Sequence, residues 1–346
     1  MTPERAGVNP TSDQQYRASV DGTTPGFEMI RDGIGAVGVP IGLGNVPYTL
    51  CYLIEDGRGS LHVVDPGDDL DAGWQSLMSA LRSMGKSVSD VASVTVTHFH
   101  HDHLAMAGRL RSASGALVGM HRLERDALRA VHSGAGRPDL AERLREWGAP
   151  GGALDAFRHL TRPPGYPDLE PDRLLEDGDR IDAPGRNLLI RQTPGHTAGH
   201  SCVQLDDERL FLSGDHVVPT VVPGIGLSAG AGADSGEAIS RYLDSLDAVA
   251  ALDGYEVLPG HGYRFRGLAT QARFIRDRHL ARTREVIDAL GRAPGTSVWE
   301  IASQLTWSAG WEGLHPMFRF AALAQTQMHM RFVHSGRAEA YLARTG

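Results

Sequence analysis

Residues 97–103 read Thr-His-Phe-His-His-Asp-His, which puts four histidines and one aspartate within six residues. Neutral imidazole and carboxylate groups suit zinc, and a carboxylate oxygen also tolerates manganese or iron. His98 and His100 are two positions apart, so an extended backbone can direct both at one ion. Asp102 and His103 follow slightly further on and can face a second ion. This cluster predicts a metalloenzyme.

The cluster stands between a strand pattern and a helix pattern. Residues 91–97 (VASVTVT) form a strand-like run, and a helical pattern starts near Leu104. We therefore expect the ligands on the loop beyond the carboxyl end of a strand, where open α/β folds place their sites. Residues 69–84 carry an apolar stripe at helical spacing, and such helices between strands predict α/β layering.

Three more candidate ligands occur downstream, each beside a glycine in a short motif. They are His196 in residues 193–197 (TPGHT), Asp215 in residues 213–216 (SGDH) and His261 in residues 258–262 (LPGHG). Each motif follows a strand-like run, and so does Asp65, which ends the run at residues 61–65 (LHVVD). All of these side chains are therefore expected at one edge of the sheet system.

Taken together, the motifs resemble those of the metallo-β-lactamase-fold hydrolases. Residues 98–103 match the HxHxDH motif of that family, and Asp65, His196, Asp215 and His261 match its other landmarks in order. The resemblance spans residues 28–265 and implies an α/β fold, a four-layer αββα sandwich. The chain is also similar to the glyoxalase II and lactamase-β-like group, and the helical pattern after residue 265 resembles the C-terminal winged-helix appendage of lactamase-β-like proteins.

The resemblance implies a ligand set and a mechanism. One divalent ion would be held by His98, His100 and His196, a second by Asp102, His103 and His261, and Asp215 would bridge them. Zinc is the expected metal, with iron or manganese as alternatives, and a hydroxide shared by both ions would attack the substrate. Asp65 would orient a ligand through a hydrogen bond from outside the ligand set.

Two candidate catalytic residues have open roles. Asp102 could act as a general base in a site with one metal ion instead of serving as a ligand. His200, four residues after His196, could contact the substrate or leaving group, or it could make a structural hydrogen bond. His216 is interpreted as a packed neighbour of Asp215 and not as a ligand.

The length of 346 residues exceeds one typical domain, and three parts are predicted. Residues 1–27 are a polar tail that is expected to be partly disordered, and residues 28–265 form the catalytic domain. Residues 122–166 are a helical insertion over the site, whose apolar side chains either line a substrate cavity or pack helices together. Residues 266–346 form a helical, winged-helix-like domain in which residues 337–342 make a short wing.

The metal centre alone suits esters, thioesters, lactones, β-lactams and phosphodiesters, because a fold does not select a substrate. The resemblance and the apolar loop at residues 217–227 favour a thioester, ester or lactone of a small organic acid. A phosphodiesterase or endoribonuclease is the alternative, since some winged-helix members of that group cleave RNA. A metal-sensing DNA-binding regulator is disfavoured, because Arg319 and Arg331 are the only arginines or lysines of the candidate recognition helix at residues 316–334.

Composition limits the partners and the compartment. The net charge is −8, which disfavours a broad nucleic-acid-binding surface, so a small-molecule substrate is expected. No apolar run approaches the length of a membrane span and no signal peptide is recognised, so we expect a cytoplasmic protein without membrane attachment. Cys51 and Cys202 do not make a disulfide framework, and Cys202 is expected in the core. The C-terminal helices could form a homodimer interface.

Overall fold

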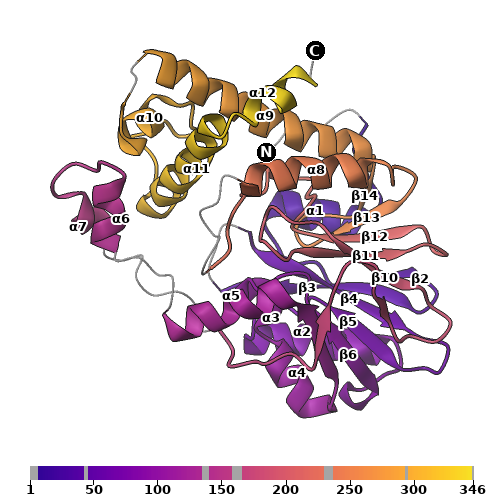
Figure 1. Ribbon diagram of the computed structural model, residues 1–346. Helices are drawn as coiled ribbons and strands as arrows, with labels where there is room; N and C mark the ends of the chain where they lie inside the picture. The colour runs from indigo at the N-terminus through magenta and orange to yellow at the C-terminus, as the bar shows by residue number, and fades with distance from the viewer. Residues whose placement is uncertain are drawn as a thin grey trace.

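The computed structural model describes residues 7–42, 46–134, 140–157, 166–229, 237–292 and 295–344. Within these residues, two seven-stranded sheets lie face to face, and helices cover their outer faces (Figure 1). This arrangement confirms the expected αββα sandwich.

The first sheet contains the strands from the amino-terminal half of the chain. In sheet order they are β2 (Glu28–Arg31), β3 (Ile34–Pro40), β4 (Tyr48–Glu55), β5 (Leu61–Val64), β6 (Val91–Thr95), β7 (Leu117–His121) and β8 (Arg173–Leu175). Strands β2 to β5 pair antiparallel, whereas β5 to β8 pair parallel. Parallel neighbours need crossover connections, and these contain α2 (Asp71–Ser83), α4 (Ala107–Ser114) and α5 (Arg122–Ser133).

The second sheet combines one short amino-terminal strand with the strands of residues 180–266. Its order is β1 (Asn9–Pro10), β14 (Phe265–Arg266), β13 (Glu256–Pro259), β12 (Leu210–Gly214), β11 (Ser201–Leu205), β10 (Leu188–Gln192) and β9 (Arg180–Ile181). The pair β12 and β13 is parallel, so the carboxyl ends of these two strands lie at the same edge.

Strand β4 shows how sequence alternation builds the layers. Leu50, Tyr52 and Ile54 belong to the apolar cluster between the two sheets, while Cys51 and Leu53 belong to the cluster under the helices. All five side chains are at most 2% exposed, because a central strand in a four-layer fold is covered on both faces. The other outer layer is α8 (Glu237–Ala250) and α9 (Leu268–Arg292), which pack on the second sheet.

The amino-terminal segment is part of the folded unit. Strand β1 pairs with β14, and α1 (Asp13–Asp21) follows with Ser12 as its N-cap. The buried carboxylate of Glu256 binds Arg264 and accepts a hydrogen bond from Thr11 at 2.7 Å, which ties this segment to the second sheet. Residues 7–27 are therefore folded onto the second sheet, which polar composition does not reveal, and residues 1–6 of the predicted tail lie outside the described residues.

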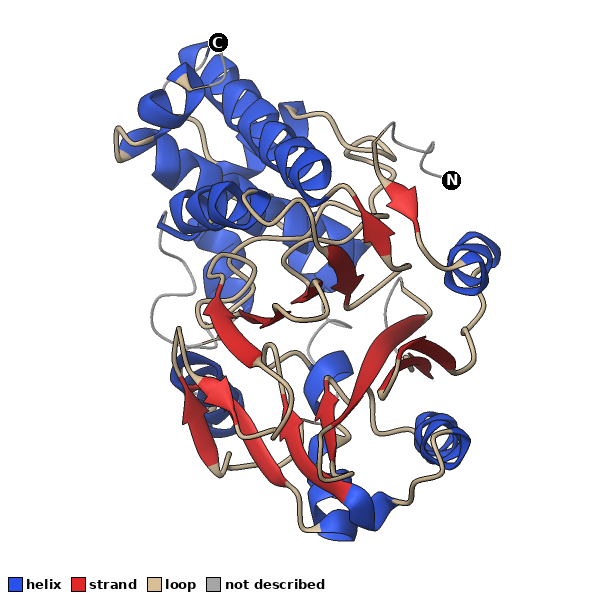
Figure 2. Cartoon of the chain, turned by 90° about the vertical axis from the view of Figure 1, so that its right-hand side faces the viewer, coloured by secondary structure: helices blue, strands red, loops and turns tan. Residues whose placement is uncertain are grey.

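The described residues after β14 form helices joined by turns. Helix α9 is followed by α10 (Val298–Gln304), α11 (Pro316–His334) and α12 (Ala338–Ala343), and Figure 2 shows helices gathered next to the C-terminus. The predicted wing at residues 337–342 is wrong, since α12 occupies that segment. None of the helices in the described ranges is both long and apolar enough to cross a membrane.

Two helices of the predicted insertion pack against the carboxyl-terminal helices. Its helices α6 (Leu140–Glu146) and α7 (Ala153–Phe157) lie beside α10 and α11 (Figure 1). Leu144, Trp147 and Phe157 are each at most 3% exposed and share one cluster with side chains of α10 and α11. The helix-packing alternative is therefore correct for these three residues.

Candidate metal centre

The predicted ligands meet at one edge of the sandwich, where several strands end. Asp65 directly follows β5, and the cluster that begins at His98 follows β6. Asp215 and His261 follow the parallel strands β12 and β13. One local expectation is wrong: a one-turn helix, α3 (His101–Leu104), carries the later part of the cluster, so Asp102 and His103 do not lie on a loop.

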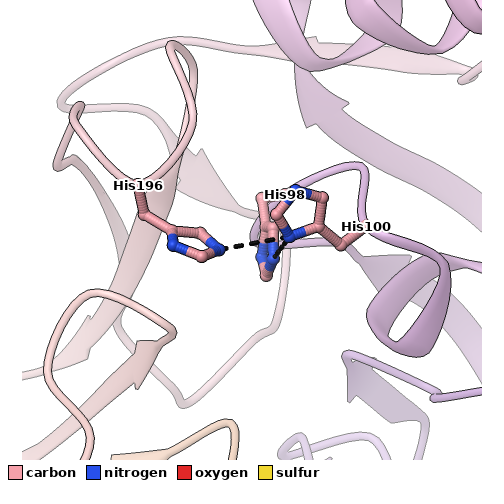
Figure 3. A group of neighbouring side chains, drawn as sticks. All are labelled: His98, His100 and His196. Atoms are coloured by element: carbon pink, nitrogen blue, oxygen red, sulfur yellow. Dashed lines mark hydrogen bonds between the residues drawn. The ribbon is translucent and has the colours of Figure 1, made fainter. Parts of the chain in front are cut away.

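A first group consists of His98, His100 and His196 (Figure 3). The Nε2 atom of His98 is 2.9 Å from Nδ1 of His100, and Nε2 of His196 is 3.1 Å from the same Nδ1. The three rings arrive from two segments that are about a hundred residues apart in sequence, as their numbers show. They converge through three ring nitrogens.

In each ring of this group, the nitrogen that points away from the other two rings (the outer nitrogen) makes a hydrogen bond, and this bond determines whether the converging nitrogen carries a lone pair. His196 donates through Nδ1 to the carbonyl of Gly224 at 2.8 Å, and His100 donates through Nε2 to the carbonyl of Leu227 at 3.0 Å. His98 Nδ1 lies 3.0 Å from the Thr97 hydroxyl. A neutral imidazole that donates through one nitrogen carries a lone pair on the other. The converging nitrogens therefore present lone pairs, which repel each other unless a cation lies between them.

A second group consists of Asp102, His103 and His261. The Nε2 atoms of the two histidines are 3.3 Å apart, and Asp102 Oδ2 is 3.3 Å from His261 Nε2 and 3.9 Å from His103 Nε2. The outer nitrogens are again engaged: Nδ1 of His103 contacts Asp65 Oδ2 at 2.8 Å, and Nδ1 of His261 contacts the Tyr48 carbonyl at 2.8 Å. In the second group, as in the first, the outer nitrogens make hydrogen bonds and the other ring nitrogens converge.

Asp215 lies between the two groups. Its Oδ1 atom is 3.3 Å from His261 Nε2 and 3.5 Å from His103 Nε2, and its Oδ2 atom is 3.6 Å from His196 Nε2. Ligand atoms on a tetrahedral ion with bonds of about 2.1 Å are separated by about 3.4 Å. The distances within and between the groups are of this size, so the residues fit two adjacent ions.

The two groups differ in charge before any cation binds. Burial lowers the pKa of His98 well below its usual value and the pKa of His196 to about 4, so these rings are neutral at pH 7. Burial also opposes protonation of His261, but Asp215 and Asp102 outweigh it and raise the pKa of His261 to about 10. The pKa of His103 is likewise raised well above its usual value by Asp215, Asp65 and Asp102, which outweigh burial.

Asp65 holds the cluster from behind. It is 2% exposed and accepts hydrogen bonds from the backbone N–H and the hydroxyl of Thr97, both at 2.8 Å, besides its contact with His103. Its φ of 51° is in the left-handed region, which aspartate tolerates better than most residues. The residue therefore orients one candidate ligand and the strand end that carries the others.

His200 lies behind the candidate ligands and does not reach the open side of the site. Its ring is fully buried, its Nδ1 lies 2.9 Å from the Thr193 hydroxyl, and its Nε2 accepts from the backbone N–H of Asp215 at 3.2 Å. The structural hydrogen bond is thus the alternative that the geometry favours for His200. His216 is buried with its ring against Tyr242 at 5.1 Å between centroids. It belongs to neither of these two groups, nor to the overlapping group of His98, His103 and Asp215.

Glu124 is a buried residue of the site that the sequence motifs do not mark. It is the third residue of α5, it is fully buried, and it accepts hydrogen bonds from Phe99 N, Thr197 Oγ1 and Gly199 N at 2.6–2.8 Å. Burial raises its pKa to about 7, and the three donors oppose that rise. The surrounding arginines at positions 122, 125 and 129 are typical of a solvated helix face, so no local pattern indicates a buried carboxylate.

The border of the site is partly apolar. The segment at residues 217–229 contains no arginine or lysine and exposes Val221, Val222 and Leu227 by 37–45%. The Leu227 carbonyl accepts the hydrogen bond from His100 Nε2. Tyr166 stacks on Phe99, the residue between His98 and His100, with 5.8 Å between ring centroids. Apolar side chains are thus exposed on a segment that contacts the first group.

Comparisons with known proteins agree with this geometry. The sequence profile of the Metallo-beta-lactamase superfamily matches residues 44–261. A hydroxyacylglutathione hydrolase of Albidiferax ferrireducens is 28% identical over 221 residues, which are 63% of this chain and 63% of that protein. An atrochrysone carboxyl ACP thioesterase of Aspergillus fumigatus is 23% identical over 242 residues, which are 70% of this chain and 44% of that protein. The crystal structure of a metallo-beta-lactamase family protein from Thermus thermophilus superposes with a TM-score of 0.69 and 25% identity, covering 89% of this chain and 95% of that one.

Proposed function

Because the chain belongs to the metallo-beta-lactamase superfamily of hydrolases, we propose that it hydrolyses an acyl thioester, ester or lactone with two divalent metal ions. The observation that carries the metal count is the placement of Asp215. One of its carboxylate oxygens faces His261 and His103, and the other faces His196. A carboxylate shared in this way suits a pair of ions better than a single ion.

The donor set supports the proposed ions. Five imidazoles present nitrogens to the two groups, and each has its outer nitrogen engaged by a carbonyl, a hydroxyl or a carboxylate. Such outer partners fix the ring orientation and the tautomer of metal-binding histidines. Nitrogen and carboxylate donors suit zinc, and iron or manganese remain alternatives. Asp102 completes the second group, and its 3.3 Å approach to His261 Nε2 supports a ligand role over that of a separate base.

Two bound ions would supply an activated water molecule and would polarise the substrate's carbonyl oxygen. The chain itself offers no thiol nucleophile, because Cys51 and Cys202 are buried and burial raises the pKa of Cys202 to about 12. Asp102 and Asp215 have lowered pKa values beside the histidines, where their attraction to the imidazolium rings outweighs burial, so both carboxylates stay ionised at pH 7. They are thereby available as ligands.

The acyl assignment rests on the border of the site and on two relatives. Val221, Val222 and Leu227 are exposed at the segment that supports the first group, and this segment carries no cation that could follow a phosphate backbone. Two relatives have names that describe hydrolysis at an acylglutathione and at an acyl carrier protein. We therefore place thioesters first, with esters and lactones next.

One substrate panel tests this order. Zinc-loaded protein is assayed against an acyl-CoA or glutathione thioester, an aryl ester, a lactone, a β-lactam, bis-p-nitrophenyl phosphate and a single-stranded RNA. The expected result is that the acyl compounds are turned over fastest and that His100→Ala abolishes this activity, while Asp68→Asn, a buried carboxylate outside both groups, retains it. Turnover confined to the phosphodiester and the RNA would reverse the order and establish the phosphodiesterase alternative.

A further inference from the structure

Glu124 is a buried carboxylate that the proposed chemistry does not use. Its side chain is inaccessible to solvent, and no salt bridge to it occurs within the described parts of the chain. An ionised carboxylate without a cationic partner is costly to bury unless hydrogen bonds satisfy it. Here Oε2 accepts from Phe99 N at 2.8 Å, and Oε1 accepts from Gly199 N at 2.6 Å and from Thr197 Oγ1 at 2.8 Å.

The three donors belong to the two segments that supply the first group. Phe99 lies between His98 and His100, and Thr197 directly follows His196. Figure 3 shows the His196 ring reaching the other two rings from a separate loop. A backbone bond from Ser201 N to the Thr97 carbonyl at 3.0 Å is a second link between these segments. Glu124 connects them from α5, so one side chain spans the junction between the two loops.

The absence of a side chain at Gly199 is a second observation on the close approach of the His196 loop to Glu124. A Cβ atom at this position would lie 2.9 Å from Glu124 Oε1 and 2.5 Å from His121 Nδ1. Any side chain there would displace the carboxylate or the loop. The backbone N–H of Gly199 also makes the shortest of the three hydrogen bonds to Glu124. Position 199 therefore has no room for a side chain beside Glu124 and His121.

We propose that Glu124 is a positioning residue for the metal ion of the first group, because it fixes the His98–His100 segment relative to the His196 loop through Phe99, Thr197 and Gly199. This inference rests on the proposed metal-dependent function. Both oxygens act as acceptors toward N–H or O–H donors, so an amide in place of the carboxylate would turn one acceptor into a donor that faces another donor. The loops would then separate slightly, and the three ring nitrogens would lose their convergence.

The test compares Glu124→Gln with Glu170→Gln, an exposed glutamate paired with Arg129 at the surface. The affinity of each variant for its two ions is measured by competition with a chromophoric chelator, and the Co²⁺ absorption spectrum reports the ligand geometry. Partners of metal ligands typically contribute a factor of about 10–100 in metal affinity. For Glu124→Gln we expect a loss of this size for one ion, a changed Co²⁺ spectrum and no comparable loss for the other ion, while Glu170→Gln matches the parent protein.

A second variant covers the case in which Glu124→Gln fails to fold. Thr197→Val removes one of the three donors without changing the side-chain shape much, and Thr197→Ser restores the hydroxyl. A loss of affinity for one ion in Thr197→Val that Thr197→Ser reverses supports the proposal. Unchanged affinities, or equal losses at both ions together with a lower melting temperature of the metal-free protein, would overturn it. If the parent protein binds no ion, the proposed function itself fails, which is a different result.

Discussion

Replacing Asp65 by asparagine should lower the affinity of the protein for one of its two proposed metal ions and leave the affinity for the other unchanged. The Asp65 carboxylate accepts from Thr97 N on one oxygen, and from the Thr97 hydroxyl and His103 Nδ1 on the other. Asparagine has nearly the same shape and tolerates the observed φ of 51°, so the backbone need not change. One of its two positions is an NH₂ group, however, which faces at least one existing donor in either orientation.

The size of the effect follows from these contacts. Asp65 is 2% exposed, so a donor left without an acceptor is not rescued by bulk water and costs about 1–3 kcal/mol in the free energy of unfolding. If His103 instead changes tautomer to accept from the amide, its Nε2 atom carries a proton and points it at His261 and Asp215. That nitrogen can then no longer bind an ion, and we expect about a 10–100-fold lower affinity for the ion of the second group.

The assay is a chelator titration of zinc-loaded protein with the metal content read by elemental analysis, together with thermal unfolding of the metal-free protein. Asp68→Asn is the matched control, since Asp68 is also buried and binds His101 Nε2 at 3.1 Å and Gly42 N at 2.9 Å, and none of these residues is a proposed ligand. In the titration, Asp65→Asn should lose one ion at a lower chelator concentration than Asp68→Asn and should keep the other ion. Equal metal affinities in the two variants would refute the orienting role of Asp65.

Three further outcomes are expected. Gln271→Ala should lower the free energy of unfolding by about 1–3 kcal/mol in urea, because its amide donates at 2.6 Å to a buried carbonyl of the 217–229 segment; an unchanged midpoint would contradict this. Glu256→Gln should cost about 1–3 kcal/mol in the same assay, since buried Arg264 loses one of its two carboxylate partners and keeps Glu28, and an unchanged midpoint would be inconsistent. Metal loading at pH 7 should release about two protons from His103 and His261, because their raised pKa values keep both rings protonated without metal, and about one more where the ions convert bound water to hydroxide. The part from the two rings should shrink as the pH rises toward 10. Calorimetry in two buffers measures the release, and zero release would exclude these assignments.

The edge of the sheet and its metal-type residues could be predicted from the sequence because those signals are local. Two histidines two positions apart, or an aspartate at the end of an apolar run, can be recognised as candidate metal ligands from a few neighbouring residues. The exact pairing of strands did not matter for that step. The positions of Asp65 and Asp215 at strand ends are therefore recovered in the structure as expected.

Features that depend on distant contacts could not be predicted in the same way. The helices α6 and α7 have an apolar face, but sequence periodicity does not say what that face covers, and it packs on α10 and α11. Glu124 stands among arginines on a helix with charged neighbours, and only the folded chain brings Phe99 and Gly199 to it. Residues 9–10 are too short to be recognised as a strand without their partner β14.

The most direct test of the proposed binuclear centre is a crystal structure of zinc-loaded protein with anomalous scattering collected at the zinc edge. Two ions are expected, one on His98, His100 and His196 and one on Asp102, His103 and His261, with Asp215 in contact with both. A single ion at full occupancy, or two ions of which neither touches Asp215, would contradict the binuclear centre.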